Sequence, residues 1–126
     1  MVNFFSKYKF IFYLSNFFLI VSYLFPGSIL GWFLYGDFSL QPQITPDYIV
    51  STNHLYAFLL LSIIGFFTFK NWNQFFPLCL YLISLSVFLE LIHLIMPTRS
   101  FEFPDLFGNI TGVIIVIIIS YYLKKT

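Results

Sequence analysis

Four apolar segments constrain this 126-residue chain more than any other feature. They cover residues 10–29, 54–69, 75–96 and 105–123. A helix rises about 1.5 Å per residue, so segments of ~16–22 residues cross or nearly cross a hydrocarbon core of ~30 Å. Prolines, glycines and polar residues separate the segments, which favours helices that start and stop over one continuous rod. The sequence therefore predicts an all-α polytopic membrane protein, a single domain over residues 1–126 built as a bundle of four transmembrane helices.

The composition agrees with lipid as the solvent. Hydrophobic residues make up 60% of the chain and charged residues only 9%, whereas a soluble domain of this size leaves about a third of its surface in water. A net charge of +1 provides no basic field for nucleic-acid phosphates, so we expect no nucleic-acid partner. The single cysteine, Cys79, lies in an apolar run, which excludes an internal disulfide and a cysteine-based metal site.

The first apolar segment has the charge pattern of a signal sequence, because Lys7 and Lys9 precede the apolar run from Phe10 to Phe25. The run lacks a cleavage site of small residues and is filled with bulky side chains. We expect a retained signal-anchor helix.

The distribution of positive charge predicts the orientation, because Lys and Arg in short loops resist translocation. Five of the six positive residues fall on one side of the predicted bundle: Lys7, Lys9, Lys70, Lys124 and Lys125. That side is expected to be cytoplasmic, with both termini on it. The outer loop between Pro26 and Asn53 contains an aromatic stretch, Gly31 to Gly36, which suits the headgroup level of the membrane.

Unusual polar residues fall together on the predicted outer side. Six of them are candidates for a binding cluster: His54, Glu90, His93, Arg99, Asp105 and Asn109. Glu90 and His93 are three positions apart, and Asp105 and Asn109 are four apart, so each pair shares one helix face. An ionisable group at this depth costs ~2.5–3.5 kcal/mol unless it is paired or hydrated, which makes such residues functional candidates. We expect Arg99 to pair with Glu90.

Each candidate also has a purely structural interpretation. Asp105 in the first turn of a helix can complement the positive end of the helix dipole, and His54 can cap the start of its helix. A Glu90–Arg99 pair can simply lock two helices together. Small residues let transmembrane helices approach closely, so Gly65 and Gly112 are expected at helix contacts.

The residues from Glu90 onward follow a spaced pattern. Glu90 lies near the end of one predicted helix, and Pro97 and Arg99 follow in a short loop. Two acidic residues, an asparagine and a glycine continue the pattern into the next helix: Glu102, Asp105, Asn109 and Gly112. This pattern resembles the VanZ-like family of small bacterial membrane proteins. Upstream, His54 followed by Phe58 is similar to the histidine and aromatic pair of that family.

The resemblance covers about residues 50–123 and implies a protein of the bacterial inner (cytoplasmic) membrane, associated with the cell envelope. The founding member of the family is associated with glycopeptide (teicoplanin) resistance. Two features depart from the family: Val50 and Ser51 stand where it often has Asp-Lys, and His93 stands where it commonly has Gln. The resemblance therefore implies no metal-binding role for His93.

Three classes of function fit the polar cluster. In the first, it binds a lipid-linked headgroup, such as a cell-wall or polysaccharide precursor, or a protein partner, with the planar fork of Arg99 on phosphate or carboxylate. In the second, the protein is a membrane-embedded acid/base enzyme, with His54 or His93 as general base, Glu90 orienting it and Arg99 stabilising charge. In the third, the chain is a small accessory subunit that packs its aromatic surface against a larger membrane complex.

No nucleophile motif stands out, so the sequence favours a protein that is not an enzyme, with membrane lipids and other membrane subunits as its partners. Glu90 and His93 have the Glu-x-x-His spacing of di-iron bundles, but those sites need two such motifs and two further Glu. A single ion held by His54, His93 and one carboxylate is chemically possible. We nevertheless expect neither a metal nor another cofactor.

Overall fold

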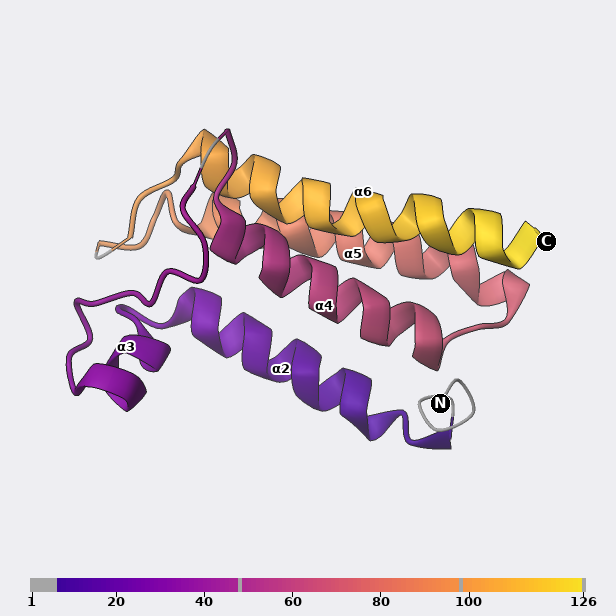
Figure 1. Cartoon of the computed structure of the whole chain (residues 1–126), viewed down its shortest axis with the longest axis horizontal. Coiled ribbons are helices and arrows are strands. Elements are labelled where there is room, and N and C mark those ends of the chain that lie inside the picture. Colours follow the sequence, from indigo (N-terminus) through magenta and orange to yellow (C-terminus); the bar gives the residue numbers. More distant parts are fainter. Residues whose placement is uncertain (1–6, 48, 98, 126) are drawn as a thin grey trace.

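The structure, a computed structural model, describes residues 7–47, 49–97 and 99–125. These residues form five helices, α2 to α6, and no strand occurs among them. The all-α prediction is therefore confirmed. In Figure 1, α4, α5 and α6 run side by side, α2 lies along α4, and the short α3 lies at the end of the bundle where the longer connections gather.

The first apolar segment forms two helices at a right angle instead of the single helix predicted over 10–29. Helix α2 spans Phe10–Leu24 and α3 spans Ile29–Tyr35, with a 90° bend between them. Phe25, the residue before Pro26, is extended (φ −70°, ψ 136°), because the proline ring disfavours helical backbone at the preceding position. The prediction missed the bend because it continued one helix through Pro26 and Gly27 to residue 29.

Helix α3 occupies the stretch that the sequence places at headgroup level. Ser28 caps its start by accepting a hydrogen bond from the backbone N–H of Gly31, and Gly36 ends it in the left-handed region at φ 68°. A Cβ on Gly31 would lie 1.6 Å from the carbonyl oxygen of Leu40, so only glycine allows this turn of the loop. The aromatic side chains of α3 are exposed, led by Phe33 at 77%.

Helix α4 spans Thr52–Thr68, α5 spans Trp72–Ile92 and α6 spans Phe103–Lys125. Helix α5 begins three residues earlier than predicted, because Asn71 and Gln74 form a capping box. Pro77 consequently lies inside α5, beyond its first turn. The same helix ends at Ile92, before Pro97, and the next residues close with tighter i→i−3 hydrogen bonds, such as Ile95 N–H to Ile92 C=O.

The α4–α6 contact is the most extensive in the bundle, followed by α5–α6. Two glycines of α6 make this close approach possible. A Cβ on Gly108 would lie 2.5 Å from the carbonyl oxygen of Ser51, and a Cβ on Gly112 would lie 2.5 Å from that of Leu55. Gly65 instead faces α2, where a Cβ would lie 3.0 Å from the ring of Phe12. Small residues thus set the distances between helices.

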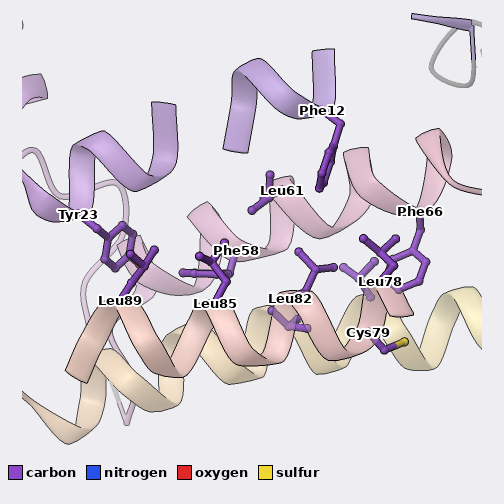
Figure 2. Close-up of a cluster of buried hydrophobic side chains, with 12 residues drawn as sticks. Phe12, Tyr23, Phe58, Leu61, Phe66, Leu78, Cys79, Leu82, Leu85 and Leu89 are labelled. Atoms are coloured by element: carbon purple, nitrogen blue, oxygen red, sulfur yellow. The ribbon is translucent and has the colours of Figure 1, made fainter. Parts of the chain in front are cut away.

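A hydrophobic core runs along the bundle between these helices (Figure 2). It includes Phe58 and Leu61 of α4 and Leu82 and Leu89 of α5, each exposed by 2% or less. Phe12 and Tyr23 bring the two ends of α2 into the same cluster. The core holds α2 against the other helices although α2 makes fewer contacts than α4 or α6.

The outer faces of the bundle are apolar as well. Phe17, Phe88 and Ile119 are each more than half exposed, as expected where lipid and not water covers the surface. Within the described residues, α5 and α6 are each long and apolar enough to cross a membrane, and α2 with α3 reaches that length only across its bend. Helix α4 is apolar but has 17 residues. The structure thus supports a membrane protein with two or three such helices, and the count of four spans stays a prediction.

The structure brings positive residues together at one end of the bundle. Lys124 Nζ donates to the carbonyl oxygen of Lys70, and Lys9 lies 5.8 Å from the ring centre of Phe69. Helix α2 begins and α6 ends at this end, opposite α3 (Figure 1). The terminal residues 1–6 and 126, whose side of the membrane the sequence predicts, lie outside the described residues.

Candidate polar binding site

The end of the bundle near α3 carries the polar residues that the sequence singled out. His54 lies in the first turn of α4, Glu90 in the last turn of α5, and His93 is the C-cap of α5. Asp105 and Asn109 lie in the first two turns of α6. The structure brings these five side chains into one connected cluster, which we call the polar cluster. Arg99 lies beside it in the α5–α6 connection and has other partners.

Asn109 is the fully buried centre of a hydrogen-bond network that joins four helices. Its Nδ2 donates to the carbonyl oxygen of Ser86 at 3.0 Å, which orients the amide so that Oδ1 faces Tyr23 and His54. The Tyr23 hydroxyl donates to this oxygen at 2.6 Å, and His54 Nδ1 lies 3.0 Å from it. The network ties α2, α4, α5 and α6 together at one depth.

The same network sets the tautomer of His54. Nδ1 lies 2.9 Å from the Tyr23 hydroxyl oxygen as well as 3.0 Å from Asn109 Oδ1. The tyrosine has one hydroxyl hydrogen, which it gives to Asn109, and the amide oxygen has none. Nδ1 must therefore carry the hydrogen and donate it. In neutral His54 the lone pair is then on Nε2, which lies 3.7 Å from Asp105 Oδ2.

Glu90 is fully buried, and its two oxygens have different surroundings. Oε1 accepts from the backbone N–H of Glu102 at 3.2 Å and lies 3.3 Å from His93 Nδ1. Oε2 lies 4.0 Å from His54 Nδ1 and has no hydrogen-bond partner within the described part of the chain. A buried polar atom without a partner is costly, so Oε2 needs a particular explanation.

His93 is committed to the protein on both ring nitrogens. Its Nε2 lies 2.9 Å from the carbonyl oxygen of Tyr23, which can only accept, so Nε2 carries a hydrogen. Its Nδ1 lies 3.3 Å from Glu90 Oε1. The ring is 2% exposed and stacks on that of Tyr23 at 6.0 Å between centres. The ion site considered from the sequence, with both His54 and His93 as ligands, is therefore not formed.

Arg99 does not pair with Glu90, which corrects the sequence-based prediction. Its Nε donates to the carbonyl oxygen of Phe25 at 3.1 Å, and its Nη2 donates to those of Ser22 and Gly27 at 3.2 and 2.6 Å. These carbonyls lie at and just beyond the end of α2, where the helix leaves acceptors unpaired and carries partial negative charge. Arg99 thus caps α2. The guanidinium nitrogens Nε and Nη2 are used in this way, and Nη1 remains as a free donor among the described residues.

A cavity of about 810 Å³ opens between α2 and α4 beside the polar cluster. Its lining is mostly apolar and includes Leu30 and Leu34 of α3. Polar groups at one end come from Tyr23, His54 and Arg99. The remainder is lined mainly by aliphatic and aromatic side chains of both helices: Leu14, Phe18, Leu19, Ala57, Leu60, Leu61 and Ile64. The cavity therefore has the amphipathic character of a lipid molecule.

Tyr23 is the central residue that sequence reasoning missed. It is one of nine tyrosines in an aromatic-rich chain, and nothing in its local sequence separates it from Tyr13. Its position gave the available signal, since Tyr23 lies at the predicted outer end of the first helix, at the depth of His54. Nothing in the sequence indicates which carbonyl oxygens Arg99 contacts, because every residue has one.

Comparison of the chain with protein-family models, curated proteins and solved structures finds no match. The geometry of the polar cluster and of the cavity therefore carries the functional argument.

Proposed function

We propose that the protein is a VanZ-like integral membrane protein of the bacterial cytoplasmic membrane and that it binds a lipid-linked headgroup at the outer face. In this proposal four helical segments cross the bilayer, both termini are cytoplasmic, and the polar cluster faces outward. The observation that carries the binding proposal is the cavity between α2 and α4, with polar groups at one end and apolar walls along the rest.

The length of the cavity suits a lipid tail. Its lining residues on α2 extend from Leu14 to Tyr23, which corresponds to about 14 Å at ~1.5 Å per residue. Half of a ~30 Å hydrocarbon core, the depth of one leaflet, is about 15 Å. An acyl or prenyl chain can therefore lie along α2 and α4 while its headgroup stays at the level of His54.

The polar end suits a phosphate-bearing headgroup. Arg99 lines the cavity and keeps Nη1 as a free donor among the described residues, and charge-assisted hydrogen bonds to phosphate are among the strong ones in proteins. Arg99 also lines a second, neighbouring cavity of about 460 Å³ with Ser39 and Gln41, which offers room for a headgroup beyond the phosphate. Helix α3, perpendicular to α2 and rich in exposed aromatic side chains, suits the interface next to it.

The test measures binding of a fluorescent polyprenyl phosphate to the purified protein in detergent. Ala57→Trp places a large side chain in the cavity, and Ile118→Trp places the same side chain on the exposed face of α6 as a control. We expect Ala57→Trp to weaken binding at least tenfold, equivalent to about 1.4 kcal/mol, and Ile118→Trp to bind as the wild type does. Equal binding by the two variants, or none by the wild type, would contradict the proposal.

A further inference from the structure

We infer that His54, Glu90 and Asp105 form a binding site for one divalent transition-metal ion. One ligand atom from each residue lies within 4.8 Å of the other two. The residues come from α4, α5 and α6, so the site is assembled by the fold and not by a local motif. This inference goes beyond lipid binding and does not depend on it.

The unpartnered oxygen of Glu90 is the independent observation that points to a ligand. Oε2 is buried, has no hydrogen-bond partner among the described residues and lies 4.0 Å from Nδ1 of His54, the ring whose Nε2 faces Asp105. The other oxygen, Oε1, already accepts from the backbone N–H of Glu102 and lies 3.3 Å from His93 Nδ1. Arg99, which would be the natural counter-charge, donates instead to the end of α2. A bound cation supplies the partner that Oε2 lacks.

His54 is oriented as metal-binding histidines usually are. Its Nδ1–H is held by Asn109 and Tyr23, so its Nε2 lone pair faces Asp105 Oδ2 at 3.7 Å. A hydrogen bond from the second ring nitrogen to a fixed acceptor sets the tautomer and the ring orientation in metal sites.

The dimensions of the cluster permit an ion after small adjustments. Adjacent ligands of a tetrahedral ion at ~2.1 Å lie ~3.4 Å apart, so the ligand atoms, which now lie within 4.8 Å of one another, must close by up to about 1.4 Å. His54 and Asp105 retain 18% and 19% exposure, whereas Glu90 is fully buried. The two half-buried side chains can therefore move toward the ion, and the cluster is open from their side for its entry and for water ligands.

The donor set selects the class of ion. One imidazole and two carboxylates suit ions such as Zn²⁺, Mn²⁺ and Fe²⁺. Calcium takes six to eight oxygen ligands and magnesium keeps most of its water, so neither matches three protein ligands that include a histidine. We expect Zn²⁺ to bind far more tightly than Ca²⁺ or Mg²⁺.

The experiment is equilibrium dialysis of the full chain in detergent, with any affinity tag removed, against Zn²⁺ with metal analysis. The wild type should bind one Zn²⁺ per chain, and excess Ca²⁺ should not displace it. Glu90→Gln and Asp105→Asn should each weaken binding by more than the ~10–100-fold typical of losing an outer-shell partner. Glu102→Gln removes the same charge from the same region without removing a ligand, and should bind as the wild type does.

Each result decides the inference. No stoichiometric binding by the wild type would overturn it, as would equal losses in Glu102→Gln and Asp105→Asn. Circular dichroism and size-exclusion chromatography show which variants fold. If Glu90→Gln, changed at a buried position, does not fold, the wild type and Asp105→Asn, changed at a partly exposed position, still provide the test. Lipid binding by a protein that binds no Zn²⁺ would overturn this inference and leave the proposed function intact.

Discussion

The hydroxyl of Tyr23 donates a 2.6 Å hydrogen bond to Oδ1 of Asn109, which joins α2 to α6 at residues 86 positions apart. Both side chains are buried. Helix α2 makes fewer contacts with the bundle than the other long helices do, and the large cavity lies along it. The polar contacts at its end, made by Tyr23 and by Arg99, therefore hold in place the helix that forms one wall of the cavity.

Replacing Tyr23 with Phe removes this hydrogen bond and retains the ring. Asn109 and His54 then lose one partner each, so we expect the free energy of unfolding to fall by about 1 kcal/mol. Thermal unfolding in detergent measures the change. Tyr13→Phe, at an exposed position of the same helix, is the control and should have no effect. An equal effect of both variants would show that the Tyr23 hydroxyl has no special role.

The double variant Glu90→Gln with Arg99→Gln tests how the two residues are related. Arg99→Gln should lower the free energy of unfolding by about 2 kcal/mol, because charged donors to three carbonyls are lost. Since Arg99 caps α2 and Glu90 contacts His93, the two effects should add within ~0.5 kcal/mol. A departure of more than ~0.5 kcal/mol from the sum of the two single effects would support the ion pair that the sequence suggested.

Sequence reasoning identified the helical class and most of the polar cluster for physical reasons. Apolar segments and their breaks are local, and intramembrane charges such as Glu90 stand out against them. The partners of Arg99 could not be predicted, because the backbone carbonyls at this end become unpaired acceptors only where α2 stops at Leu24, ahead of Pro26. Tyr23 was missed because its role comes from tertiary contact with Asn109 and His54.

Gly112→Ala tests the close approach of α4 and α6. The added Cβ would lie 2.5 Å from a backbone carbonyl oxygen of α4, so the helices must separate, and overpacking of this kind costs about 1–3 kcal/mol. Gly65→Ala meets only side chains, the ring of Phe12 at 3.0 Å and Leu78 at 3.4 Å, and these side chains can move. We expect the Gly112 variant to unfold at clearly lower temperature than the Gly65 variant. The opposite order would contradict the proposed role of the α4–α6 contact.

The carboxyl of Asp47, in the loop before α4, is expected to make the stability of the fold depend on pH. The backbone N–H of Thr52 and other donors, including the Thr52 hydroxyl and Gln43, lower the pKa of this carboxyl below its ordinary value. A lowered pKa in the folded state stabilises the fold above the unfolded pKa of about 4, and this contribution is lost as the pH falls through the folded pKa. Unfolding of the wild type should therefore show a small loss of stability over that range that Asp47→Asn lacks. Parallel profiles of the two proteins would contradict this.

The proposed orientation is tested with single cysteines at Ser39 and Thr126, each in a Cys79→Ser background that removes the buried native thiol. Ser39 lies in the exposed connection between α3 and α4, at the end of the bundle opposite the lysines of α6. Because lysines favour the cytoplasmic side, an impermeant thiol reagent should label Ser39→Cys in intact cells and label Thr126→Cys only after permeabilisation. Labelling of Thr126→Cys alone in intact cells would invert the topology and place the polar cluster inside. Labelling of both would mean that the helices between them cross the membrane an even number of times, which the proposed four-span arrangement does not allow.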